Sequence, residues 1–552
     1  MEEHRPQISR QYVPQHKTPP TLECSLFYFT IEANMNFVRS VGWLRRLLPL
    51  ALLTGAISFV PVATGPTSTA VASGSCAISS NDAQYRFIAI PGDVASKQSN
   101  IEVRLGIKNT GSVSQTWTVN FYVDTITPSL KLNVSPILVT IGASAHGLAN
   151  VVWNPISFPG AHNLLYQATV GGVTTDNSAS PWPIKILDVT TKAPSYFGGT
   201  WVEPGQLLQD PAVSQNASAG VAYVNARVDE MHTLGIGTII IAYSEFVGIN
   251  IGPFYNSSLS YLNSTDPAKI PAFDVVGTIL HQACLDGMHV IVGLGRGPQT
   301  WLNLDQIPAE TQARMDQTAS FEHDLANDLY NKYGINDYYG ANNGTFYGWY
   351  NAYEANTYDN AKYFYDKVAL DLHNSFGPEK AVLIAPAGSP TGISTATLNS
   401  SQSDIFAYQE AVGTGYVGPG ATCLPGCGAA YTYTWNPYNR INDLSTIFSQ
   451  YAGWHSTTNK HIWADTELWQ MDGPSYNNPY TALCQRVRDQ IEPERNYTSM
   501  LTAYDFFGPM KSPANTNTLI PYTNASQMYS GYKAYYDAGQ PNMTGATRLC
   551  TP

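Results

Sequence analysis

Two glutamates could act together as an acid and a base, because each ends a stretch with the pattern of a buried strand. Glu354 ends FYGWYNAYE, where one face of an extended chain carries Tyr350 and small residues before the acid. Glu467 ends HIWADTE further along the chain. A protonated and an ionised carboxyl group on opposite sides of a substrate can serve as general acid and general base. This chemistry requires a fold that brings the two strand ends together.

Other charged or polar residues also follow predicted strands. Asp465 shares its parity with Glu467 and competes with it for the role of nucleophile, and Glu410 could replace either glutamate. Because buried like charges repel, a chain keeps several carboxylates together mainly for function. We expect further groups at this site to orient a substrate or stack on it: Trp201, Glu203, Tyr243, Glu245, Arg296, Tyr350, Gln409, Glu410, Asp465, Trp469 and Asp505.

From residue 198 to about 540, short apolar stretches alternate with helical ones that often end at a glycine. The expected strands are 199–204, 236–246, 289–295, 346–354, 380–388, 404–413, 461–469 and 499–508. The expected helices are 219–234, 274–286, 320–333, 360–376, 444–454, 479–491 and 525–538. Eight strands, each followed by a helix or a long loop, predict an α/β fold, a (β/α)8 TIM barrel, whose reactive groups lie at the carboxyl ends of the strands.

An all-β region precedes the barrel. Residues 76–187 contain six or more short strands with apolar and polar residues in alternation, as in IEVRLGIKNTG, and turn residues between them. This pattern predicts a small immunoglobulin-like β-sandwich, joined to the barrel by a linker at 188–197. A spacer role is favoured for it over sugar binding, which only analogy of fold supports.

The chain begins with segments that we exclude from the fold. Residues 1–34 are polar and without periodicity, and we interpret them as an extension that is disordered or not native. Residues 35–72 have the arginines, apolar run and small-residue cleavage site of a signal peptide, which predicts a secreted protein. The alternative is a membrane anchor, but an apolar run of about 16 residues is shorter than the ~20 that a spanning helix needs.

Removal of this leader would leave six cysteines, and an even number in an exported chain favours disulfides. Cys423 and Cys427 flank a Pro-Gly turn and are expected to pair, while the other pairings stay open. A metal site is the alternative, but no histidine lies near these two cysteines at ligand spacing.

Composition narrows the possible partners. Only 13% of the residues are charged, the formal net charge is −12, and 12% of the residues are aromatic. An acidic chain without basic patches is unsuited to nucleic acid, whereas aromatic side chains suit the flat faces of neutral sugars. We expect a monomer that needs no cofactor. We also expect no metal site, because the histidines that could bind one are scattered along the chain: His281, His289, His323 and His461.

Several of these stretches carry a family resemblance. FYGWYNAYE and IWADTELW resemble the strand-four and strand-seven signatures of the large clan of TIM-barrel glycoside hydrolases. With TWVEP, IIIAYSEF and the strand end at Gln409 and Glu410, the region 198–508 is similar to a poorly characterised group of bacterial and fungal barrel domains assigned to that clan. One difference is Tyr353, which stands where clan members often have asparagine, while Asn351 and Asn356 flank Glu354.

The resemblance implies a retaining hydrolase with Glu354 as acid/base and Glu467 as nucleophile. A carboxyl separation of ~5 Å would give retention of configuration, and one of ~6.5–9.5 Å would give inversion. The substrate would be an extracellular polysaccharide or glycoconjugate. The alternative from another class is a non-catalytic carbohydrate-binding or cell-surface protein on the same scaffold. A metal-dependent deacetylase or phosphodiesterase is disfavoured by the scattered histidines.

Overall fold

The structure is a computed structural model. It describes residues 76, 84–246, 251–259, 266–295, 302, 304, 311–334, 344–355, 357–386, 390–413, 437–472, 475–515, 522 and 524–539. The predicted extension, the signal peptide, Arg296 and the expected Cys423–Cys427 pair lie outside these residues.

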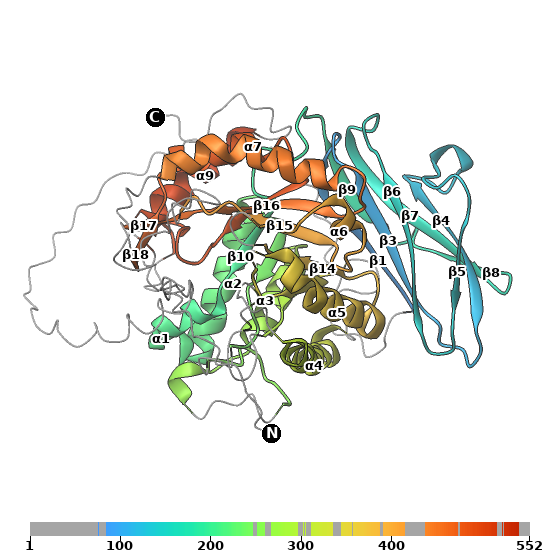
Figure 1. The fold of residues 1–552 in the computed structure, drawn as a ribbon, viewed down its shortest axis with the longest axis horizontal. Coiled ribbons are helices and arrows are strands. Elements are labelled where there is room, and N and C mark those ends of the chain that lie inside the picture. Colours follow the sequence, from blue (N-terminus) through green and yellow to red (C-terminus); the bar gives the residue numbers. More distant parts are fainter. Residues whose placement is uncertain are drawn as a thin grey trace, which may run out of the picture.

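Eight parallel strands form a closed barrel, which confirms the predicted TIM-barrel fold (Figure 1). Around the barrel they are β10 (Gly199–Val202), β11 (Thr238–Ile241), β12 (His289–Gly293), β13 (Phe346–Asn351), β14 (Ala381–Ile384), β15 (Ile405–Gln409), β16 (His461–Glu467) and β19 (Met500–Tyr504). The strands are short and almost entirely buried, because barrel side chains fill one face and helices cover the other.

Helices lie between the strands and form the outer layer. They are α1 (Pro211–Ser214), α2 (Ala217–Thr233), α3 (Val275–Leu285), α4 (Gln312–Leu329), α5 (Tyr358–Phe376), α6 (Thr395–Asn399), α7 (Pro437–His455), α8 (Cys484–Glu494) and α9 (Ala525–Gly539). Helix α2 shows why local sequence sets these bounds. The Asn216 side chain accepts a hydrogen bond from the N–H of Ala219 at its start, and Gly235 follows its end with φ of 78°.

The prediction for residues 479–491 was wrong in its first part. Strand β18 (Ser475–Thr481) pairs antiparallel with β17 (Trp469–Asp472), and α8 begins only at Cys484. Pro479 explains the difference, since proline biases the residue before it toward extended backbone. The hydrogen bond of 2.7 Å from Gln470 Nε2 to Tyr480 Oη links the two strands.

The N-terminal region is all-β, as predicted, with two packed sheets. One contains β1 (Tyr85–Ile90), β3 (Ile101–Lys108) and β6 (His146–Trp153). The other contains β2 (Val94–Ser96), β9 (Trp182–Leu187), β7 (Gly160–Val170), β4 (Gln115–Val123) and β5 (Ile137–Ile141), and β8 (Val173–Asp176) pairs with β7. Phe87 of β1 packs against Tyr166 and Trp182 of the second sheet, with ring centroids 5.4 and 6.3 Å apart.

The sandwich docks against the amino-terminal ends of the barrel strands. Arg104 forms an ion pair of 2.7 Å with Asp404, the residue before β15, and Glu102 lies 3.0 Å from His461 at the start of β16. Further around this end, Tyr347 Oη of β13 donates to the carbonyl of Ala89 at 2.8 Å. The sandwich is therefore part of the packed structure and leaves the carboxyl ends of the strands uncovered.

The connecting segment 188–197 is also packed rather than extended into solvent. Ala193 and Phe197 are fully buried, and the N–H of Ala193 donates to the carbonyl of Arg495. A disulfide joins Cys76, ahead of the sandwich, to Cys284 near the end of α3, and Cys484 is disulfide-bonded as well. These contacts join the two regions covalently and through buried polar groups.

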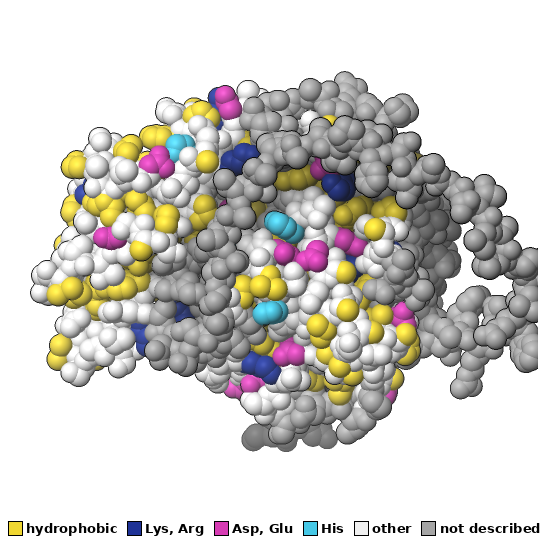
Figure 2. All heavy atoms as spheres, turned by 180° about the vertical axis from the view of Figure 1, so that it is seen from behind, with side chains coloured by type: hydrophobic (Ala, Val, Ile, Leu, Met, Phe, Trp, Pro, Cys, Tyr) yellow, Lys and Arg dark blue, Asp and Glu magenta, His cyan; other side chains and the backbone are white. Residues whose placement is uncertain are grey.

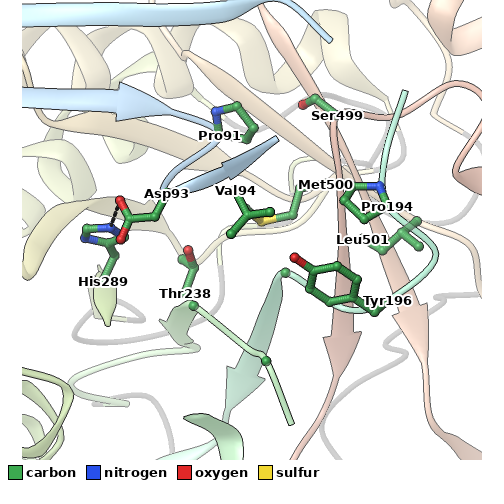
Figure 3. A pocket seen from close by; sticks show the side chains of 13 residues that line it. Pro91, Asp93, Val94, Pro194, Tyr196, Thr238, His289, Ser499, Met500 and Leu501 are labelled. Carbon is green, nitrogen blue, oxygen red and sulfur yellow. Dashed lines mark ion pairs between the residues drawn. The ribbon is translucent and has the colours of Figure 1, made fainter. Parts of the chain in front are cut away.

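A pocket lies at this junction (Figure 3). Asp93 and Val94 of the sandwich face Thr238, His289 and Met500 at the starts of barrel strands, and Asp93 pairs with His289 at 2.9 Å. The pocket is thus at the opposite end of the barrel from the predicted site.

On the outer surface, hydrophobic side chains are spread over the sandwich, at the left of Figure 2, and the exposed ones include Val113, Val134, Leu138, Ile156 and Val173.

Candidate active site

Strand β16 carries two acids into the barrel mouth. Thr466 points outward, where its Oγ1 donates to Oε2 of Glu494 on α8 at 2.7 Å. Since side chains alternate along a strand, Asp465 and Glu467 point inward. They are only 3% and 8% exposed, and the N–H of Gly413 donates a hydrogen bond to Glu467 Oε2.

Glu354 approaches these acids from the far side of the barrel. It lies three residues after β13, which is separated from β16 by two strands, and it is half-buried. Below it, the ring of Tyr350 lies 4.7 Å from the ring of Trp201 of β10 and fills the barrel interior. Both Glu354 and Glu467 interact electrostatically with Asp465. Three carboxyl groups from two facing strands therefore meet in one mouth.

The surroundings of Asp465 favour its protonated form. Burial raises the pKa of Asp465 well above its usual value, the neighbouring Glu467, Glu354 and Glu410 raise it further, and a hydrogen bond with Trp201 opposes them. Its Oδ1 has no hydrogen-bond partner among the described residues. A protonated carboxyl group facing the mouth can donate a hydrogen bond but is a poor nucleophile, so Glu467 is the better candidate for that role.

A second pair of acids borders the mouth at the ends of β10 and β19. Tyr504 Oη donates to Oε1 of Glu203, and Gln206 Nε2 donates to Oδ2 of Asp505 at 2.5 Å. Burial, followed by the charge of Glu203, raises the pKa of Asp505 to about 8. Tyr504 also interacts electrostatically with Glu354, so this pair and the central acids form one site.

Glu245 and Tyr243 follow β11. Burial raises the pKa of Glu245 to about 9, and its Oε2 has no hydrogen-bond partner among the described residues. Tyr243 packs against Phe246 and Phe254, with ring centroids 5.6 and 5.8 Å apart, and is 4% exposed. In this structure Tyr243 is packed in an aromatic cluster.

Glu410 lies outside the mouth. Tyr408, two residues before it, points outward and stacks on Tyr451 of α7 at 4.1 Å, and Glu410 has the same parity. Its Oε1 accepts hydrogen bonds from the N–H of Glu467 at 2.7 Å and from Gln490 Nε2 of α8. The structure thus places Glu410 behind β16, whereas the partly exposed Gln409 has the parity of the barrel interior.

Two further aromatic residues near the site, Tyr353 and Trp469, are both buried. Tyr353, which replaces the asparagine of the resembling clan, packs edge-on against Phe364 of α5 with centroids 5.2 Å apart and so points away from the mouth. Trp469 of β17 is 7% exposed, and its carbonyl accepts a hydrogen bond of 2.9 Å from Arg486 Nη2.

The sequence prediction missed the α8 residues behind the site, Arg486, Gln490 and Glu494. Their spacing of four residues puts them on one face of a helix, a signal that was present in the sequence. This face contacts the backbone of Glu467, whose carbonyl accepts from Arg486 Nη2 at 2.5 Å and from Gln490 Nε2 at 3.3 Å.

Among the described residues, no group of three His, Cys, Asp or Glu side chains could hold a metal ion. His289 and His461 pair with Asp93 and Glu102 at the opposite end of the barrel. In the same part of the chain, no helix has the length and apolar character needed to cross a membrane.

Comparison with known sequences identifies a family. The sequence profile of a family described as "Domain of unknown function (DUF4434)" matches residues 199–517. No curated protein matches the chain in sequence.

Among solved structures, a Bacteroides thetaiotaomicron protein provisionally named an alpha-L-fucosidase is 16% identical. The match covers 63% of this chain and 95% of that one, with a TM-score of 0.44. A GH2 beta-galacturonidase from Eisenbergiella tayi is 10% identical, with coverage of 85% and 72% and a TM-score of 0.35. Bacteroides uniformis beta-glucuronidase 2 is 10% identical, with coverage of 82% and 50% and a TM-score of 0.34.

Proposed function

This chain belongs to the DUF4434 family, and we propose that it is a secreted glycoside hydrolase that cleaves an extracellular polysaccharide or glycoconjugate. The observation that carries the proposal is the meeting of Glu354 and Glu467 around Asp465, each close enough to act on the pKa of the same carboxyl group. Facing carboxyl groups at the carboxyl end of a TIM barrel are the arrangement that glycosidic cleavage requires.

In the proposed mechanism Glu467 is the nucleophile and Glu354 the acid/base. Glu467 attacks the anomeric carbon as an ionised carboxylate, which the N–H of Gly413 stabilises. Glu354 donates its proton to the leaving oxygen, and then takes a proton from the water that hydrolyses the glycosyl-enzyme intermediate. Asp465 stays protonated, which limits the repulsion between three close carboxyl groups.

The other mouth residues would bind the sugar. Glu203 and Asp505, at the ends of β10 and β19, offer hydrogen-bonding groups for hydroxyls beside the central acids. Gln409 adds an amide on the other side, and Trp469 adds an aromatic ring at the start of the β17–β18 hairpin. Arg296, which follows β12 in the sequence, is proposed as a further substrate contact.

The test is a panel of polysaccharides with product analysis, followed by the variants Glu354→Gln and Glu467→Gln. Each should lower kcat by about 10²–10⁴-fold, the usual worth of an acid/base group or nucleophile, while substrate binding persists. Glu492→Gln on the exposed side of α8 is the matched control and should keep wild-type activity.

Two outcomes would contradict the proposal in different ways. Full activity of both glutamine variants would refute the site assignment. Sugar binding without hydrolysis by the wild type would instead favour a non-catalytic carbohydrate-binding protein. The anomeric configuration of the first product, followed by NMR, should be retained, and an inverted product would remove Glu467 from the role of nucleophile.

A further inference from the structure

Two acids are buried together behind β16, on the side away from the barrel mouth. Glu410 follows β15 and is 1% exposed, and Glu494 is the last residue of α8 and is fully buried. Neither faces the proposed substrate. Because an unpaired buried carboxylate is expensive, such a pair needs a compensating role in the structure.

Glu410 holds the backbone of the proposed nucleophile. Its Oε1 accepts from the N–H of Glu467 at 2.7 Å and from Gln490 Nε2 on α8. Its own carbonyl accepts from Arg440 Nε on α7 at 2.8 Å. The Glu410 side chain therefore connects the residue after β15 to the end of β16 and to α8, and its backbone is held by α7.

Glu494 holds the same strand one residue earlier. Its Oε2 accepts from Thr466 Oγ1 at 2.7 Å, and the charge of Glu494 raises the pKa of Glu410. Two carboxyl groups that interact in this way repel each other less when one of them carries a proton.

The surroundings of the pair raise the pKa of both acids. Burial and the charge of Glu494 raise the pKa of Glu410 well above its usual value, Glu467 adds to this, and Arg486 opposes it. Burial raises the pKa of Glu494 to about 8, and Asp465 adds to it.

We propose that Glu410 and Glu494 are positioning residues, which fix the Glu467 N–H and the Thr466 side chain so that the Glu467 carboxylate is aimed into the mouth. The proposal rests on the proposed function of Glu467. Together with the bonds from α8 to the Glu467 carbonyl, the pair fixes the peptide groups on both sides of this residue. Catalytic groups need support of this kind, since a misplacement of ~1 Å can lower the rate by about 10²-fold.

The experiment compares Glu410→Ala with Glu410→Gln. The alanine variant should lower kcat by about 10–100-fold with KM changed less than about threefold, because it removes the support and no substrate contact. The glutamine variant should stay within about threefold of wild-type kcat, since its amide can accept from the Glu467 N–H and donate to Glu494. Glu492→Ala, on the exposed side of the same helix, is the control and should leave kcat unchanged.

The outcomes separate this proposal from the proposed function. If Glu467→Gln is inactive but a folded Glu410→Ala variant keeps wild-type kcat, the positioning role is wrong and the proposed function stands. A loss of kcat that glutamine does not rescue also overturns the positioning role. If the wild type hydrolyses no sugar, the proposed function fails, and the positioning role is then tested by crystal structures of the wild type and Glu410→Ala. A shifted backbone at 465–468 in the variant supports the positioning role, and an unchanged backbone overturns it.

A milder variant covers the case in which Glu410→Ala does not fold. Thr466→Val keeps the shape of the side chain and removes only its hydrogen bond to Glu494. It should lower kcat by about 3–10-fold at constant KM, as expected for the loss of one hydrogen bond to a charged group. Wild-type kcat in Thr466→Val would overturn the proposal.

Discussion

Replacing Arg104 with methionine should destabilise the whole chain, because this buried cation joins the sandwich to the barrel. Arg104 is 4% exposed and lies 2.9 Å from Glu102 of its own strand and 2.7 Å from Asp404 before β15. Methionine keeps much of the volume but leaves two buried carboxylates without their cation. Breaking a buried ion pair in this way costs about 3–5 kcal/mol.

The pKa of Glu102 gives a second measure of the same interaction. Burial acts to raise this pKa, but Arg104 and His461 outweigh it and lower the pKa from 4.5 to about 2. At ~1.4 kcal/mol per pH unit, a shift of this size corresponds to about 3 kcal/mol. A lowered pKa of an acid stabilises the fold above pH 4.5, and the stabilisation is lost as the pH falls toward 2.

Urea unfolding at pH 7 and at several values below pH 4.5 measures both effects. Arg104→Met should lose about 3–5 kcal/mol at pH 7, and its stability should fall less steeply with acid than that of the wild type. Lys97→Met is the matched control, because Lys97 pairs with the largely exposed Asp188 and should cost less than about 1 kcal/mol. A loss in Arg104→Met no larger than that in Lys97→Met would refute the reasoning.

Three further predictions follow from single contacts. Glu245→Gln should be more stable than the wild type by about 4–5 kcal/mol at pH 8 and by only about 1 kcal/mol at pH 5, because a pKa raised to about 9 means that the stability of the wild type falls as the pH rises above 4.5. Parallel pH curves in urea unfolding would contradict this. Cys284→Ser removes the bond to Cys76 and should cost about 2–4 kcal/mol, an effect absent when both proteins are unfolded under reducing conditions. Tyr504→Phe removes the hydroxyl that donates to Glu203 and should lower kcat/KM by about 10-fold, measured on the substrate found in the panel, with unchanged kcat/KM as the contrary result.

The barrel could be predicted because the sequence patterns that specify it are local. A buried strand, a helix and a glycine that ends the helix recur along the chain, and Gly235 and Gly287 have the positive φ that such helix ends need. The β17–β18 hairpin is an exception to this recurring pattern, since Tyr480 and its neighbours pair with the preceding strand instead of starting a helix. A local sequence pattern does not show whether a short aromatic stretch will pair with a neighbouring strand or begin a helix.

The site could be predicted only in part, because inward and outward positions differ by a single residue. Gln409 and Glu410 both follow β15, and a shift of one residue exchanges their faces. The outward packing of Tyr408 on Tyr451 decides between them. The docking of the sandwich was also beyond local pattern, since Arg104 and Asp404 are 300 positions apart.

The pKa values of buried acids are shifted in opposite directions at the two ends of the barrel, and this difference supports the proposed function. At the amino-terminal end, Arg104 and neighbouring histidines lower the pKa of Glu102 and Asp404, so these acids are ionised and contribute to stability. At the carboxyl end, burial and like charges raise the pKa of Asp465 and Asp505, which therefore reduce stability at neutral pH. The same chain can pair a buried acid with a cation where only stability is at stake. That it gathers acids at the mouth, where burial and like charges raise their pKa values, supports the proposal that they serve a reaction. The mouth, and not the buried network at the other end, is therefore the place to test for catalysis.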